Sequence, residues 1–92
     1  MTLVLILRRD HTGVLSIGAG SRPVEWWAVG EDAVGATAEG ARFDLVVDIR
    51  DLFPERAAAP RWGGTGTVDG LTYMLEGGAS PEGLRLEGTV AP

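Results

Sequence analysis

Tryptophan and arginine are the residue types in this sequence best suited to binding another molecule. The 92 residues include three tryptophans, Trp26, Trp27 and Trp62, and Arg61 directly precedes the last of them. Trp and Arg dominate the energetics of protein interfaces, and an exposed indole also stacks on sugars or apolar ligands. Adjacent residues of a strand point to opposite faces, so Trp26 and Trp27 cannot both enter one core. We therefore predict that these four residues form a binding site. The alternative, favoured by the high average burial of Trp, is that a loop covers the outward indole.

Nucleophilic catalysis finds little support in the sequence. His11 is the single histidine and lies where a turn is expected, and none of the serines, Ser16, Ser21 and Ser80, sits in a Gly-x-Ser-x-Gly motif. The chain has no cysteine, which excludes thiol catalysis, disulfides and thiolate metal sites. We predict an exposed turn histidine and no catalytic residue.

One dense run of carboxylates is the strongest candidate for metal binding or acid–base chemistry. It consists of Asp44, Asp48, Asp51 and Glu55. On a strand, Asp44 and Asp48 share a face and could approach closely enough to hold Ca²⁺ or Mg²⁺ or to act as an acid and base pair. Arg50 lies on the same face and can neutralise them, and no EF-hand spacing is present. The pattern favours a solvated strand face, and we predict no metal site.

Nucleotides and nucleic acids are poor candidates as ligands. The glycine-rich segment 63–67 lacks the lysine of a phosphate-binding loop, because the chain contains no lysine, and it does not match Gly-x-Gly-x-x-Gly. The net charge is −5, and the only adjacent basic residues are Arg8 and Arg9. Binding to a phosphate backbone needs a cluster of cations. We predict no cofactor and no nucleic acid, whereas a basic or neutral protein surface would suit an acidic chain.

Length and composition predict one globular domain over residues 1–92. Hydrophobic residues make up 45% of the chain, and 14 glycines suit a turn-rich β domain. The longest apolar run, Leu3 to Leu7, is too short to cross a bilayer, and it precedes Arg8 and Arg9 where a signal peptide would follow basic residues. We expect a soluble, cytoplasmic protein. All eight basic residues are arginine, which together with the many Ala and Gly residues is typical of a GC-rich bacterial genome.

Alternating apolar and polar residues, interrupted by Gly-bearing turns, predict an all-β fold. In the last segment Leu84, Leu86 and Val90 point one way, and Arg85 points the other. We expect about six to eight short antiparallel strands in a meander, closed as a small barrel or packed as a sandwich. The expected strands span 2–9, 13–17, 24–29, 43–50, 65–68, 71–76 and 84–90. The first is apolar at every position from Leu3 to Leu7, which favours a strand covered on both faces. Ala33 to Ala38 is weak as strand or helix.

Two segments are harder to interpret. Residues 43–50 alternate as a strand, but a helical stripe also fits, which would give an α+β fold with one short helix near 44–56. That helix would place Asp44 over Asp48 and Asp51 over Glu55, two repulsive pairs, so we favour the strand, with a single helical turn at 51–56 as an option. Residues 57–66 have no period and contain Pro60 and several glycines. We predict that they form the longest loop, the 77–83 segment a second one, and that Trp62 lies on a mobile rim.

Three functional hypotheses remain. The first is a non-enzymatic module that engages a protein partner through the Trp26 and Trp27 strand and the 57–66 loop, as a small acidic inhibitor or immunity-type protein would. The alternative is a β-barrel that binds a small apolar molecule, with or without weak acid–base catalysis by Asp44 or Asp48. The third is a symmetric homo-oligomer formed through an open strand edge. A concave apolar pocket would favour the barrel, and a flat exposed aromatic patch the interaction module.

Overall fold

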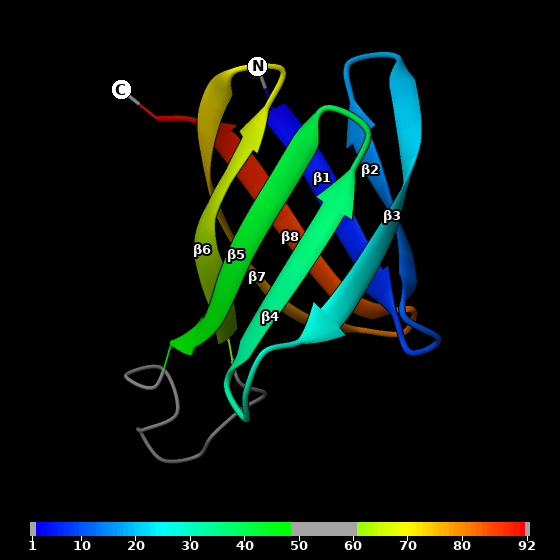
Figure 1. Ribbon diagram of the computed structural model, residues 1–92, viewed down its shortest axis with the longest axis vertical. Coiled ribbons are helices and arrows are strands. Elements are labelled where there is room, and N and C mark those ends of the chain that lie inside the picture. Colours follow the sequence, from blue (N-terminus) through cyan, green and yellow to red (C-terminus); the bar gives the residue numbers. More distant parts are fainter. Residues whose placement is uncertain (1, 49–60, 92) are drawn as a thin grey trace.

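The chain forms a closed, antiparallel β-barrel in which each strand pairs with its neighbours in sequence and the first strand pairs with the last (Figure 1). The computed structural model describes residues 2–48 and 61–91, without the side chains of Val47 and Asp48. Its eight strands are β1 (Thr2–Arg8), β2 (Thr12–Ile17), β3 (Gly20–Ala28), β4 (Ala33–Ala38), β5 (Ala41–Asp48), β6 (Arg61–Val68), β7 (Leu71–Ser80) and β8 (Gly83–Val90). The predicted all-β fold is confirmed, as a barrel of eight strands.

Residues 43–50, whose pattern fits both a strand and a helix, form a strand as far as Asp48. In β5, Phe43 and Leu45 are buried whereas Asp44 and Val46 are exposed, which is the period of two that the sequence predicts. The α+β alternative is therefore wrong for residues 44–48. The remainder of that segment, with the helical turn expected at 51–56, lies outside the described residues, as do residues 57–60.

All eight described strands contribute side chains to the barrel interior, although glycines occupy some of the inward positions. The buried core comprises Leu3, Leu5, Leu7, Leu15, Val24, Val34, Ala36, Phe43, Leu45, Val68, Tyr73, Leu75 and Leu86. Gly66 lies in register between the two largest of them, Phe43 and Tyr73. A Cβ at Gly66 would be 2.1 Å from Cδ1 of Phe43, so the absence of a side chain there makes room for the aromatic ring.

Several segments expected to be loops belong to strands instead. Residues 61–66, predicted to be part of the longest loop, form most of β6, and residues 77–80 extend β7, which reduces the predicted 77–83 connection to 81–82. β3 begins at Gly20, four residues before the predicted start, and continues through Pro23. Glycine and proline normally weaken strands, but closure gives each strand a hydrogen-bonded neighbour on both sides, and this pairing outweighs local preference.

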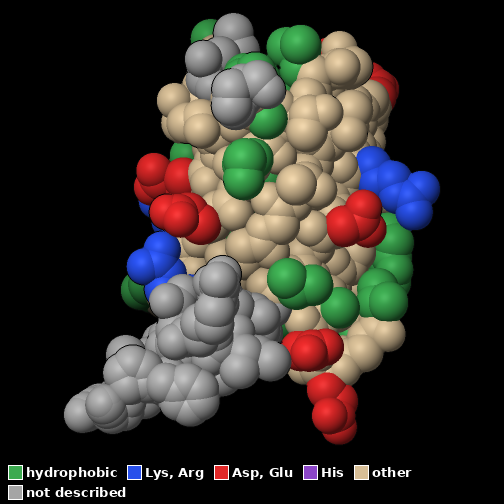
Figure 2. Space-filling model, turned by 90° about the vertical axis from the view of Figure 1, so that its left-hand side faces the viewer, with side chains coloured by type: hydrophobic (Ala, Val, Ile, Leu, Met, Phe, Trp, Pro, Cys, Tyr) green, Lys and Arg blue, Asp and Glu red, His purple; other side chains and the backbone are tan. Residues whose placement is uncertain are grey.

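The outer wall of the barrel has no second layer among the described residues. Val4 and Ile6 of β1 are half-buried and face outward, so the expectation that this strand is covered on both faces is wrong. Side chains of both charges lie among single hydrophobic ones on the wall (Figure 2), and the ion pairs include Arg85–Glu87 and Arg61–Glu76. All eight described strands have two neighbours, which removes the open edge that the homo-oligomer hypothesis required.

Arg22 ties together the end of the barrel that is uppermost in Figure 1. Its guanidinium donates hydrogen bonds to both carboxylate oxygens of Asp69, at 2.7 and 3.1 Å, and to the backbone carbonyl of Glu39 at 2.8 Å. One side chain of β3 therefore joins the β4–β5 turn to the β6–β7 turn. No helix in the described part of the chain is long and apolar enough to cross a membrane.

Candidate functional site

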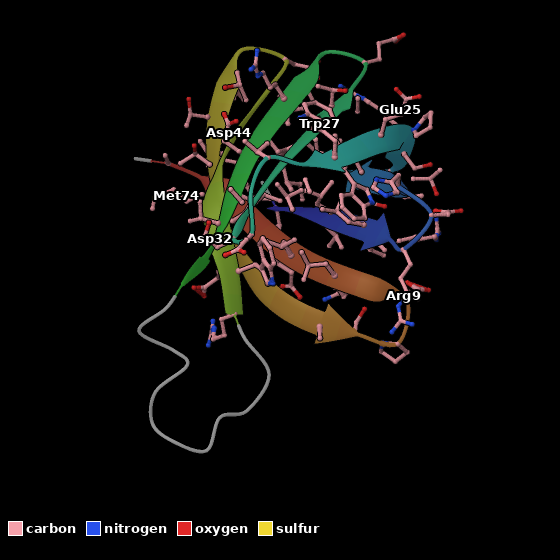
Figure 3. The ribbon with its side chains drawn as sticks, turned by 60° about the horizontal axis from the view of Figure 1, so that its bottom comes forward. Arg9, Glu25, Trp27, Asp32, Asp44 and Met74 are labelled. Carbon is pink, nitrogen blue, oxygen red and sulfur yellow. The ribbon has the colours of Figure 1, made fainter. Side chains whose placement is uncertain are left out.

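The opposite end of the barrel contains a cavity of about 450 Å³. It lies where β1, β3 and β7 end and β4, β6 and β8 begin, and Figure 3 brings this end forward. Its larger apolar lining residues are Leu7, Trp26, Val34, Trp62 and Leu84. Pockets that hold small molecules typically measure about 300–1,000 Å³ and are lined mainly by hydrophobic and aromatic side chains. In size and lining, this cavity is similar to such pockets.

Small residues explain why the barrel is open here and filled elsewhere. An eight-stranded barrel is just wide enough for side chains to fill or to hold one small ligand. In the middle of the barrel, Phe43, Tyr73 and the leucines fill the interior. Around the cavity, the small side chains of Ala28 and Ala79 stand at the ends of β3 and β7 and leave volume unfilled.

Trp26 forms one wall of the cavity and is held from two directions. Its Nε1–H donates a hydrogen bond to the backbone carbonyl of Arg8 at 2.7 Å. Its ring stacks on His11, with the ring centroids 4.4 Å apart and the planes 19° from parallel. Nδ1 of His11 lies 3.2 Å from the Trp26 carbonyl oxygen, so the imidazole nitrogen is the donor in this contact. The indole is therefore fixed in place before any ligand arrives.

His11 is an exposed turn residue, as the sequence predicts, but its stacking on Trp26 was not predicted. Its backbone is left-handed, with φ of 70°, and its N–H donates to the Arg8 carbonyl at 3.2 Å. Histidine is among the non-glycine residues that accept this conformation best. This backbone conformation is not visible in the sequence, so the stacking of His11 on Trp26 had no signal there.

Trp62 lies in β6, far from Trp26 in the sequence, and lines the same cavity. It is half-buried and packs against the core. The prediction that Trp62 sits on a loop is therefore wrong, because Trp62 pairs with Val47 on one side and Gly77 on the other. Trp26 and Trp62 both line this cavity.

Trp27 lies on the outer wall, away from the cavity (Figure 3). It is 43% exposed, and its indole lies over Gly35 of β4, where a Cβ would be 2.8 Å from the nearest ring carbons. The sequence correctly predicts that Trp26 and Trp27 face opposite ways. The consequence is that Trp27 does not join the site formed by the other two tryptophans.

Charged residues at the cavity are different from those predicted. Arg61, the predicted partner of Trp62, pairs with Glu76 of the neighbouring strand at 3.6 Å and is not among the cavity-lining residues. Arg8, Arg9 and Glu31 line the cavity instead. Hydrogen bonds from the side chain and backbone of Thr12 lower the pKa of Asp10, and the charge of Arg8 adds a minor contribution.

Of the carboxylates considered for metal binding or catalysis, Asp44 is not among the residues that line this site. Asp44 is exposed on the outer wall, where it lies in register between Gly35 and Thr65. The side chain of Asp48 is not described, and Asp51 and Glu55 lie outside the described residues. In residues 2–48 and 61–91 no group of three or more His, Asp or Glu side chains is arranged to hold a metal ion.

Comparisons with known proteins give one partial match. No family model and no solved structure matches the chain. Over 58 residues, 60% of this chain, the sequence is 41% identical to the tRNA 5-methylaminomethyl-2-thiouridine biosynthesis bifunctional protein MnmC of Methylibium petroleiphilum. The match covers 9% of that protein's length, so it is a similarity to a short segment of a much longer protein.

Proposed function

We propose that the chain is a binding protein whose barrel holds a small molecule with a planar, apolar body at its open end. The observation that carries this proposal is the cavity of about 450 Å³ with Trp26 and Trp62 in its wall. Aromatic side chains contribute large apolar contact areas and favour planar partners that stack or pack edge to face. Of the two main hypotheses from the sequence, this concave site favours the ligand-binding barrel.

The state of Trp26 indicates what kind of contact it offers. Its indole N–H is already bonded to the Arg8 carbonyl, so the ring has no free donor for a ligand. It therefore offers apolar surface and π density. Because the ring is also held by His11, little side-chain freedom remains to be lost on binding, which favours affinity.

The titratable groups at the cavity support binding without catalysis. The described side chains that line it include Arg8, Arg9 and Glu31 as ionisable groups. Arginine remains protonated in proteins and does not serve as a general base. Among these described side chains Glu31 has no partner with which to divide acid and base roles, and no histidine lies beside Ser80, the serine that lines the cavity.

The three indole N–H groups allow a direct test by NMR. Titration with 1-naphthylmethanol, a neutral planar probe, should shift the indole resonances of Trp26 and Trp62 saturably and leave that of Trp27 in place. Ala28→Phe, which fills the cavity, should weaken binding at least about tenfold. Trp27→Ala is the matched control on the outer wall and should bind the probe normally. A saturable shift confined to Trp27, or no saturable shift in the millimolar range, would refute the proposal.

A second candidate function, engagement of a protein partner, rests on the outer wall near the same end. Trp27, Val29 and Val46 are 43%, 65% and 51% exposed. Val29 donates its N–H to the carbonyl of Ala33, the residue that pairs with Val46, so these side chains belong to one neighbourhood. A partner bound there should be recovered from the native host by the unmodified chain and by Ala28→Phe, and lost with Trp27→Ala.

A further inference from the structure

We propose that the ligand of the barrel carries a negatively charged group, which Arg9 and Arg8 hold at the rim of the cavity. This inference rests on the proposed function and specifies its ligand class, a planar aromatic carboxylate. Both arginines line the cavity beside the apolar wall formed by Trp26 and Leu7. A carboxylate on an aromatic body would place the ring against the tryptophans and the charge at the opening.

Arg9 lies in the turn that follows β1. Leu5 and Leu7 point into the barrel, and Arg9 comes two residues later, just past the end of the strand. Figure 3 shows Arg9 at the rim of the open end, in the connection between β1 and β2. Arg8 is half-buried, and its backbone carbonyl accepts the hydrogen bond of Trp26. Both residues thus belong to the strand end that positions the indole. By the same alternation Arg8 lies on the side of β1 that carries Val4 and Ile6, so Arg9 is the first candidate for contact with the anionic group and Arg8 the second.

Within the described residues, Arg8 and Arg9 lack a carboxylate partner, as does Arg42 of β5. Arg22, Arg61 and Arg85 each pair with an acidic side chain. Within the described residues neither Arg8 nor Arg9 forms an ion pair, although Arg8 is close enough to affect Asp10 electrostatically. In a chain of net charge −5, two unpaired cations at an apolar cavity mark a place where an anionic group would be stabilised.

The alternative is a cationic ligand held by the tryptophans and Glu31. Tryptophan faces attract cations, and Glu31 also lines the cavity. The described cavity-lining side chains, however, contain two arginines against this one carboxylate, and a cationic ligand would have to approach both arginines. The balance of charge at the cavity therefore favours an anion.

Three probes with the same aromatic body and different charges test this inference. They are 1-naphthylacetate, 1-naphthylmethanol and 1-naphthylmethylammonium, titrated by calorimetry at pH 7 in 50 mM and 500 mM NaCl. We expect the anion to bind about fivefold more tightly than the neutral probe, as for a partly solvated ion pair, and the cation to bind most weakly. High salt should reduce the preference, because it screens exposed charges.

Arginine variants identify the source of the preference. Arg9→Gln, and Arg8→Gln as a second variant, should each reduce it, whereas Arg85→Gln on the outer wall should retain it. Equal binding of the anionic and neutral probes, or an unchanged preference in both rim variants, would overturn the inference while leaving the proposed function in place. Tightest binding of the cation would also overturn it and assign the role to Glu31. Failure of all three probes would overturn the proposed function as well.

Discussion

The two adjacent tryptophans illustrate how strongly position on a strand determines the environment of a residue. Trp26 points toward the barrel interior, where its N–H bonds to Arg8 and its ring stacks on His11. Trp27 points outward and covers the backbone at Gly35, a contact of the kind by which an aromatic residue protects a glycine on a neighbouring strand. The same side chain therefore serves as a cavity wall at one position and as an external cover at the next.

Replacement of Trp62 by alanine should now be more costly than its predicted place on a loop would imply. The side chain is half-buried and packs against the core. Complete removal of a buried Trp costs about 3–5 kcal/mol, and we expect about 2 kcal/mol for one buried to this extent. Urea unfolding of Trp62→Ala, with Trp27→Ala as the control on the outer wall, measures it. A loss well under 1 kcal/mol would mean that Trp62 does not pack as described.

At the scale of elements, the β1–β2 turn contains a histidine in a backbone conformation that residues other than glycine adopt infrequently. His11 has φ of 70°, which is favourable for glycine and unfavourable for alanine. His11→Gly and His11→Ala both remove the stacking on Trp26, but only alanine also experiences the backbone strain. We expect His11→Ala to be less stable than His11→Gly by about 1 kcal/mol. Thermal melts in which the alanine variant is equal or superior would exclude the left-handed conformation.

Strand β8 allows a direct test of which side chains face the core. Leu86 is completely buried, whereas Arg85 is exposed and pairs with Glu87. Leu86→Asp should unfold the domain or cost at least about 4 kcal/mol, because it places an unpaired carboxylate in the core. Arg85→Asp should cost less than about 1 kcal/mol, since it replaces an exposed ion pair by an exposed repulsion. Comparable losses in chemical denaturation would show that the facing is wrong.

Prediction from sequence succeeds for those elements in which local pattern and barrel closure agree. The alternation in β5 and β8 and the Asp69–Gly70 turn are visible in the residues themselves, and both residues of that turn have positive φ, as a tight hairpin turn requires. The sequence underestimates β6, because its inward positions include Gly64 and Gly66. Those glycines make room for neighbours such as Phe43, which lies far away in the sequence. Such long-range complementarity leaves no local pattern.

The candidate site was predictable only in its aromatic part. Trp26 and Trp62 stand out by residue type, and strand pleating separates Trp26 from Trp27 without any structure. The association with Arg8, Arg9 and His11 depends on which turns meet at one end of the barrel. Arg61 was chosen for its position beside Trp62, but adjacent residues of a strand face opposite ways, and it pairs on the outer wall with Glu76.

At the scale of the whole molecule, the two ends of the barrel differ in chemistry. One end has the apolar cavity with Arg8 and Arg9 at its rim. At the other end, Arg22 binds Asp69 and the Glu39 carbonyl and so connects separate turns. A closed barrel has access to its interior only through its ends. With one end tied together, the open end is the natural entrance for a ligand, which agrees with the direction of binding that we propose.

The tied end should respond to pH, and the sign follows from Asp69. Hydrogen bonding from Arg22 lowers the pKa of Asp69 below its ordinary value of 3.8, and the positive charge of Arg22 adds to the effect. A carboxyl group whose pKa is lower in the folded state stabilises the fold above its unfolded pKa, and this contribution is lost as the pH falls through the folded pKa. The affected range therefore lies below about pH 4.

Carbon-detected NMR titration of the Asp69 carboxyl should give a higher pKa in Arg22→Gln than in the unmodified chain. Asp69→Asn should correspondingly lose less stability between pH 5 and pH 2.5 in urea unfolding than the unmodified chain does. If Asp69 titrates at the same pH in Arg22→Gln and in the unmodified chain, Arg22 does not bind the Asp69 carboxylate, and the turns alone must maintain this end of the barrel.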